Sequence, residues 1–289
     1  MHLTFTIAGA TGRFQTLAPL LLEHEHHVRV LTRETESPTA KGLRALGAEI
    51  RFGDFDEPET LVAAAQGADA FFAAGTAHRV GPDGEARHGI AAADAAKISG
   101  VPHFVYMSGS GAGADTGVPV FDAKGAAEAH IRSLALPHTI IAPVYFMENL
   151  FNPWNLQALA AGVFPSPVGT DRPLQQVAIR DVVSFAALVL ERPEEFLAKR
   201  VELASEKLTG AEVARALSRV MGRQFAAERV GCKSLPDGVA RLFVWLEQIG
   251  DHVEIATLHA RYPEVGWLSF ERWAARQDWS QLKRLDGRQ

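Results

Sequence analysis

Apolar runs with strand character alternate with stretches of helical periodicity along the first two hundred residues. The first apolar run, at 3–8, meets a glycine turn at Gly9-Ala-Thr-Gly12 and then a helical pattern at 17–23. This alternation predicts an α/β fold with a doubly wound parallel sheet, whose strand ends share one ligand-binding rim. Further strands are predicted at 27–33, 48–52, 69–76, 102–110, 138–146 (broken at Pro143) and 201–204, and helices at 41–47, 57–66, 86–99, 121–132 and 177–191.

The pattern changes after about residue 150. A Gly/Pro-rich stretch at 162–173 lacks clear periodicity, and 209–289 is mainly helical with four of the five tryptophans. Between 77 and 84, Gly-Pro and Asp-Gly pairs predict a loop. We expect a nucleotide-binding domain over 1–150, with 176–204 packing back on it. A smaller, mainly helical substrate-side subdomain is expected from 151–175 and 205–289.

The glycine turn is the first candidate site. Strand, glycine turn and helix together form a dinucleotide-binding unit, in which backbone amides approach a pyrophosphate at the helix N-terminus. Gln15 occupies the third glycine position and Pro19 must lie near the first helical turn, so a reshaped loop is expected. An alternative hypothesis is that Gln15 abolishes dinucleotide binding altogether. The candidate cofactor contacts here are Gly9, Thr11, Gly12, Arg13 and Phe14.

The second strand ends at Arg33, at the position that faces the adenine ribose in this architecture. A guanidinium there attracts a 2′-phosphate, whereas an acidic residue would bind ribose hydroxyls, so NADP(H) is the predicted cofactor. Arg13 could reach the same phosphate, and the alternative for Arg33 is a solvated side chain. Asp54, after the third strand, is expected near the adenine or as an ordinary turn residue. The end of the fourth strand adds backbone candidates at Ala74, Gly75 and Thr76.

Composition narrows the classes of partner. The 289 residues carry 29 basic and 34 acidic side chains, net −5, without a dense basic patch, so nucleic-acid binding has no electrostatic support. The single cysteine, Cys232, excludes an internal disulfide and fits a reducing compartment. Neither a secretory signal nor a membrane-spanning apolar run is recognisable. We expect a cytoplasmic protein with a small-molecule substrate, and a homodimer or a partner protein is possible.

Several segments together resemble the NmrA-like family of atypical short-chain dehydrogenases/reductases. They are Gly9-Ala-Thr-Gly12, Arg33, Gly53-Asp54, the Phe121-Asp-Ala-Lys124 helix and Phe146-Met-Glu-Asn149, in that order and spacing. The resemblance implies an NADP(H)-binding Rossmann domain with a smaller C-terminal substrate domain. It implies either a reductase, as in the isoflavone- and quinone-reductase-like members, or a regulator that senses the dinucleotide without turnover.

Three residues are candidates for catalysis. The usual reductase pair is a Tyr four residues before a Lys; Lys124 is present, but the earlier position holds Val120. Lys124 could bind the nicotinamide ribose or manage charge on the substrate oxygen, and its alternative is an exposed lysine paired with Glu128 at i,i+4. Ser108 could face the substrate or close a turn. Tyr145 could donate a proton, although pocket lining is favoured.

Two other clusters invite a function and are better explained without one. The histidines of His24-Glu-His-His27 have no distant Cys/His partners, so a solvated surface is favoured over a metal site. Cys232 lies near Arg229 and Lys233 but has no resolving cysteine. The sequence therefore predicts an NADP(H)-dependent oxidoreductase for a small apolar carbonyl, quinone or enone, with a non-catalytic NADP(H)-sensing regulator as the alternative.

Overall fold

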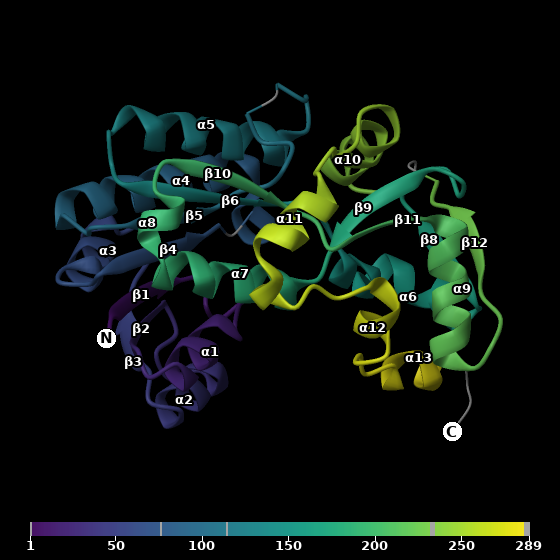
Figure 1. The fold of residues 1–289 in the computed structure, drawn as a ribbon, viewed down its shortest axis with the longest axis horizontal. Coiled ribbons are helices and arrows are strands. Elements are labelled where there is room, and N and C mark those ends of the chain that lie inside the picture. Colours follow the sequence, from purple (N-terminus) through teal and green to yellow (C-terminus); the bar gives the residue numbers. More distant parts are fainter. Residues whose placement is uncertain (1, 76, 114, 232–234, 286–289) are drawn as a thin grey trace. The chain divides into compact units, whose positions relative to one another are not determined.

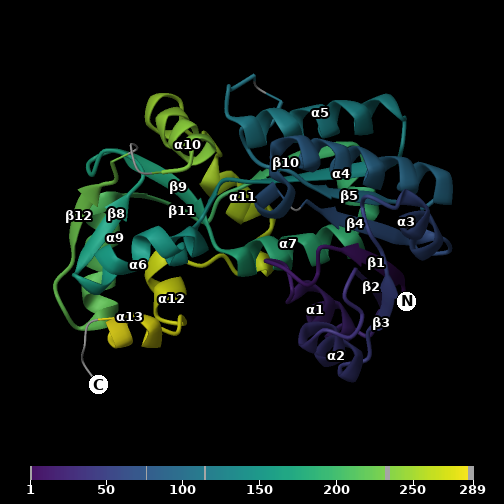
Figure 2. The ribbon, with the colours of Figure 1, turned by 180° about the vertical axis from the view of Figure 1, so that it is seen from behind.

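The computed structural model describes residues 2–75, 77–113, 115–231 and 235–285, and the chain divides into two compact units. The first unit comprises Met1–Ala142 and Val182–Glu202, and the second comprises Pro143–Asp181 and Leu203–Gln289. Figures 1 and 2 show the ribbon from opposite sides.

A seven-stranded sheet forms the centre of the first unit, in the order β10-β6-β5-β4-β1-β2-β3. The pairs from β3 through β6 are all parallel, and the order reverses between β1 and β4. This is the predicted doubly wound Rossmann sheet, and the reversal is where such sheets bind ligands. The strands are β1 (Thr4–Ala8), β2 (His27–Thr32), β3 (Glu49–Phe52), β4 (Ala70–Ala74), β5 (Phe104–Met107), β6 (His138–Pro143) and β10 (Lys199–Leu203).

Helices cover both faces of this sheet (Figures 1 and 2). One face carries α3 (Pro58–Ala65), α4 (Ala77–Ser99) and α5 (Pro119–Ser133) over a core that includes Phe71, Phe104 and Tyr106. Alanines let these helices approach closely, since Ala92, Ala96 and Ala127 are fully buried. The other face carries α1 (Leu17–Glu23), α2 (Pro38–Ala45) and α7 (Ile179–Glu191); α8 (Pro193–Phe196) precedes β10.

The loop predicted at 77–84 is wrong. Backbone of helical type begins at Ala77 and continues to Ser99, interrupted only at Gly81, where φ is 70° and ψ is −177°. The turn signals therefore produce a kink at one residue instead of a long loop. Gly100 follows with φ 69°, as the predicted helix end requires.

The second unit combines helices with two small sheets, ordered β11-β9-β7 and β12-β8. These strands are short, and β8 and β9 each carry a proline, so they lack the alternation that predicts a strand. A core of buried aromatics including Phe164, Phe270, Trp273 and Trp279 holds the unit together. Its elements are β7 (Tyr145–Phe146), η1 (Met147–Phe151), α6 (Pro153–Ala160), β8 (Val163–Ser166), β9 (Pro173–Val177), β11 (Glu206–Thr209), α9 (Gly210–Met221), β12 (Ala226–Arg229), α10 (Asp237–Gln248), α11 (Ile255–Arg261), η3 (Pro263–Val265), α12 (Phe270–Ala274) and α13 (Ser280–Leu285).

Two carboxylates cross-link distant segments of the second unit. Glu148 of η1 accepts hydrogen bonds from the backbone N–H of Ile179 at 3.0 Å and from the indole N–H of Trp273 at 2.9 Å. Asp181 is fully buried and accepts from the Ser205 hydroxyl at 2.6 Å and the backbone N–H of Leu268 at 2.8 Å. Both carboxylates are satisfied by hydrogen bonds, so they join the segments without leaving buried charge unpaired.

Candidate functional site

The glycine turn lies where β1 and β4 approach each other at their carboxyl ends. Gly9 has φ +96°, and a Cβ placed on it would lie 3.0 Å from both the Cβ and the carbonyl oxygen of Ala74. Only glycine meets both demands without strain. The N–H of Gly12 donates to the carbonyl of Gly9 at 3.2 Å, which closes the first turn.

The chain then makes a longer turn than the three-glycine pattern would. Residues 10–16 are turns, and α1 begins only at Leu17. Phe14 is buried, with its ring edge-on to Phe72 of β4 at 6.2 Å between centroids, whereas Arg13 and Gln15 are exposed. Gln15 therefore keeps its side chain out of the helix–sheet interface, which is where the usual third glycine is needed. The loop is reshaped as predicted, and Gln15 does not obstruct it.

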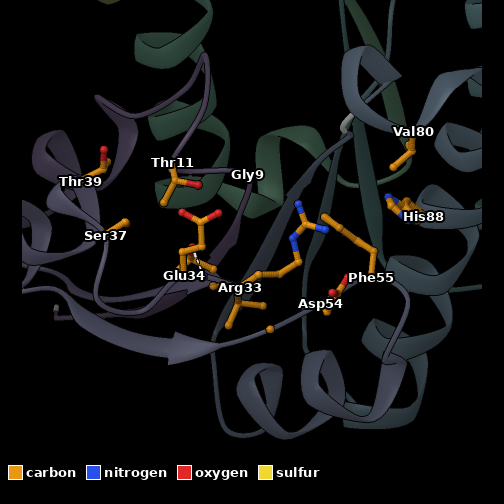
Figure 3. A pocket seen from close by; sticks show the side chains of 13 residues that line it. Gly9, Thr11, Arg33, Glu34, Ser37, Thr39, Asp54, Phe55, Val80 and His88 are labelled. Atoms are coloured by element: carbon orange, nitrogen blue, oxygen red, sulfur yellow. Dashed lines mark hydrogen bonds between the residues drawn. The ribbon is translucent and has the colours of Figure 1, made fainter.

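A cavity of about 230 Å³ opens beside this turn, within the first unit. Figure 3 shows the carboxylate of Glu34 directed toward Thr11 and the guanidinium of Arg33 directed the other way, toward the ring of Phe55. Positive and negative side chains thus point to different parts of one pocket. The lining residues are Gly9, Thr11, Leu31, Thr32, Arg33, Glu34, Ser37, Thr39, Gly53, Asp54, Phe55, Val80 and His88.

One wall of the pocket is a flat aromatic pair that the sequence did not single out. Phe55 and His88 stack with ring centroids 5.1 Å apart and an interplanar angle of 15°. His88 is held by a contact of 3.1 Å between its Nε2 and Asp56. Asp54 lines the same pocket, and its carboxylate accepts from the N–H of Asp56 at 3.1 Å, as in an ordinary turn. Its place near the adenine stays a prediction.

Lys124 lies at the carboxyl end of β5, but its partner is not the expected one. Its Nζ donates to Oε1 of Glu85 at 2.5 Å and to the carbonyl of Met107 at 3.2 Å. The alternative of an exposed lysine paired with Glu128 is therefore wrong: the Lys124 side chain is only 15% exposed. Glu85 comes from α4, one residue before the start of the predicted helix.

Glu128 instead fixes the segment that follows β5. It is buried and accepts from the Ser108 hydroxyl at 2.5 Å, from Arg132 at 2.6 Å and from Arg200 of β10 at 3.1 Å. The guanidinium of Arg200 also donates to the carbonyls of Gly109 and Ser110, each at 2.9 Å. The Ser108 hydroxyl thus has a partner inside the protein, and a substrate-facing role would require that bond to open.

Tyr145 belongs to the second unit, where it lines a small apolar cavity with Met147, Phe164 and Phe270. Its ring lies 6.5 Å from that of Phe243. Two sequence candidates, Thr76 and Cys232, lie outside the described residues.

The histidine cluster has a partner that is not a metal. His24 and His26 both contact the carboxylate of Glu191, at 2.5 and 3.3 Å. Across the described parts of the chain, His, Cys, Asp and Glu side chains nowhere gather in threes to hold a metal ion. Within that same coverage, the helices include none that is both long and apolar enough to cross a membrane.

The structure therefore brings Gly9, Thr11, Arg33 and Asp54 together around one pocket, at the strand-order reversal of a parallel sheet. Ala74 and Gly75 lie beside the glycine turn, and Lys124 lies at the end of the next strand. A glycine turn, a pocket beside the end of β2 and this strand order define a dinucleotide-binding Rossmann protein.

Comparison with known proteins gives the family: the model of the NmrA-like family matches residues 1–271, and the chain belongs to this family. It is 31% identical over 219 residues to the NAD(P)H azoreductase of Xenophilus azovorans, covering 75% of this chain and 73% of that protein. NmrA, a negative transcriptional regulator solved in complex with NADP, has a TM-score of 0.78 with 23% identity, covering 95% of both chains. The triphenylmethane reductase of Citrobacter sp., solved with NADP(H), has a TM-score of 0.70 with 21% identity, covering 98% of this chain and 95% of that one.

Proposed function

We propose that this protein is an NADP(H)-dependent oxidoreductase that reduces a small apolar carbonyl, quinone or enone. The observation that carries the proposal is the largely buried ammonium of Lys124 at the end of β5. It lies in the same unit as the glycine turn and the pocket that Arg33 lines. The azoreductase similarity adds azo compounds to the substrates worth testing.

The residues present fit a dinucleotide. Gly9 permits close backbone approach at the strand-order reversal, and the pocket offers a guanidinium for a 2′-phosphate and a flat aromatic wall for a base. At about 230 Å³, the pocket is smaller than the roughly 300–1,000 Å³ of complete ligand sites, so it would hold only the adenosine end.

In the proposed reaction the nicotinamide, when bound, supplies the hydride. Lys124 offers an N–H from a fixed ammonium to an oxygen that gains negative charge, which is the electrostatic stabilisation that such a reduction needs. Val120 stands where the family's tyrosine acid would be. We therefore assign the final proton to water or to another donor, with Tyr145 kept as a candidate.

Cofactor choice is tested by titration with NADPH and NADH. We expect tighter NADPH binding, and we expect Arg33→Ala to weaken NADPH binding by about 10-fold while leaving NADH nearly unchanged. Arg29→Ala is a matched control, since Arg29 lies on β2, which ends directly before Arg33, but pairs with Glu49 outside the pocket. Equal affinity of the unmutated protein for both cofactors would refute the 2′-phosphate assignment.

The alternative function is a non-catalytic regulator that binds NADP(H) and a partner protein. The missing tyrosine acid favours it. NADPH oxidation with a panel of quinones, enones and azo dyes separates the two functions. Tight NADPH binding without turnover of any of them, together with NADPH-dependent binding of a partner, would favour the regulator.

A further inference from the structure

An unpredicted ion pair lies at the carboxyl ends of β4 and β5, between Glu85 of α4 and Lys124 of α5. The Glu85 side chain is 1% exposed and that of Lys124 is 15% exposed, with 2.5 Å between Oε1 and Nζ. Both charges are largely removed from water, so each depends on the other. The pair between Asp94 and His130, which joins the same two helices, is more exposed.

The neighbouring strands are shaped to receive the Glu85 carboxylate. It lies against Gly75, directly after β4, where a Cβ would come within 2.0 Å of Oε1 and 2.3 Å of Oε2. A methyl group at position 75 would therefore displace the Glu85 carboxylate. The carboxylate therefore occupies a space formed by the same 74–75 backbone that approaches Gly9 at the glycine turn.

The pair also determines what Lys124 has left to offer a ligand. An ammonium has three N–H donors and no acceptor. Among the described residues, one donor goes to Glu85 and one to the carbonyl of Met107, while the ammonium lies 5.7 Å from the centre of the Tyr106 ring. One donor is left for a ligand oxygen.

Tyr106 does not replace the tyrosine acid missing at Val120. Its hydroxyl is buried, makes no hydrogen bond within the described structure, and packs toward Gly89. Burial, with added repulsion from Glu85 and Glu128, raises the pKa of the Tyr106 phenol far above its ordinary value. The Tyr106 ring therefore packs beside the Lys124 ammonium, and its hydroxyl does not act as a proton donor.

We propose that Glu85 is the positioning residue of Lys124: it holds the ammonium at the ends of β4 and β5 with one donor directed to a single ligand oxygen. The catalytic consequence rests on the proposed reductase function. Lys124 then acts as a cation of fixed position, because the buried Glu85 carboxylate and the Met107 carbonyl hold its ammonium in place.

The pair is tested first without a cofactor, by the rate at which Lys124 is reductively methylated. The rate is read by peptide mass spectrometry against the exposed Lys97. The contact with Glu85 holds Nζ in a largely buried position. Glu85→Gln releases the side chain to the reagent and is expected to speed methylation of Lys124 by at least about fivefold, and Glu85→Asp by less. Asp94→Asn is the matched control, since it breaks a more exposed ion pair between α4 and α5, the one with His130. An unchanged rate in folded Glu85→Gln would overturn the proposal.

If Glu85→Gln does not fold, the double variant Glu85→Gln/Lys124→Met decides. Removing one member of a buried pair leaves an unpaired charge, whereas removing both does not. Recovery of folding in the double variant supports the pair, and failure to recover overturns it.

The catalytic consequence is tested with NADPH and menadione as the quinone probe. Glu85→Gln is expected to lower kcat by about tenfold with little change in KM for NADPH, and Glu85→Asp to restore part of the loss. Values of kcat and KM equal to those of the unmutated protein would overturn the positioning role. Failure of the unmutated protein to oxidise NADPH with any quinone would instead count against the reductase function, and the methylation result would still decide the ion pair.

Discussion

A buried histidine makes the stability of the first unit depend on pH. His103, just before β5, is 1% exposed; its Nε2 lies 2.8 Å from the Thr139 hydroxyl, which itself donates to the carbonyl of Phe196. Thr139 therefore accepts a hydrogen bond from an Nε2–H. His103 Nδ1 makes no hydrogen bond within the described structure. Burial, with a smaller contribution from His138, lowers the pKa of His103 from 6.5 to about 4.

The direction in which stability changes with pH follows from proton binding by His103. Between the two pKa values the unfolded chain binds a proton that the folded protein does not, so stability falls as pH decreases through this interval. A difference of two and a half pKa units corresponds to about 3 kcal/mol in full, and to about 2 kcal/mol at about pH 5. Above the ordinary histidine pKa of 6.5 the effect vanishes.

The variant His103→Gln keeps a donor for Thr139 and removes the titration. The assay is hydrogen exchange of peptides covering β5 and β6, because all five tryptophans lie in the second unit and their fluorescence does not report on this region. We expect the unmutated protein to lose about 2 kcal/mol of protection relative to the variant between about pH 7.5 and about pH 5. Parallel pH dependence in both proteins would refute a neutral buried His103.

Three further outcomes are expected. Gly75→Ala places a methyl group in the space of the Glu85 carboxylate and should cost about 1–3 kcal/mol in thermal or urea unfolding, together with faster methylation of Lys124; a variant with unmutated values would contradict the packing. Gly9→Ala strains a positive φ and presses on β4, so NADPH affinity should fall at least about tenfold by isothermal titration, whereas Gly42→Ala, in the open surface of α2, should bind normally. Arg200→Met leaves the buried Glu128 with one fewer cation and removes the donor to three carbonyls, those of Gly109, Ser110 and Ala112, so exchange of the amides at 108–112 should accelerate while that of α2 stays the same.

The sheet could be predicted from the sequence because its signals are local. The strands β1 to β5 are each followed by a helix, and the helix at Leu17–Glu23 and the break at Pro143 appear where the pattern places them. The strands at Val163–Ser166 and Pro173–Val177 were not predicted, because short proline-bearing strands lack a period and depend on pairing with distant segments. Cytoplasmic localisation and the catalytic roles of Ser108 and Tyr145 stay predictions.

The pairing of charges in the site could not be read from spacing. Lys124 and Glu128 stand four residues apart on a helix, which favours their contact in isolation. In the folded protein, Glu128 binds Arg200, 72 residues later, and Lys124 binds Glu85, 39 residues earlier. The folded sheet brings these residues together, so tertiary contacts override the i,i+4 pairing of Lys124 with Glu128 that the helix alone would favour.

The chain leaves the first unit after Ala142 and returns at Val182. The edge strand β10, which completes the sheet beside β6, is therefore synthesised after the other six strands. On a ribosome, β10 and its Arg200 emerge only after the whole segment 143–181 has been synthesised. Until then β6 is an open sheet edge, and the segment after β5 lacks the guanidinium that binds its carbonyls. A nascent chain stalled before residue 199 should therefore be protease-sensitive at 108–112 and prone to pair through β6, and the first unit gains its rigidity only when translation has passed β10.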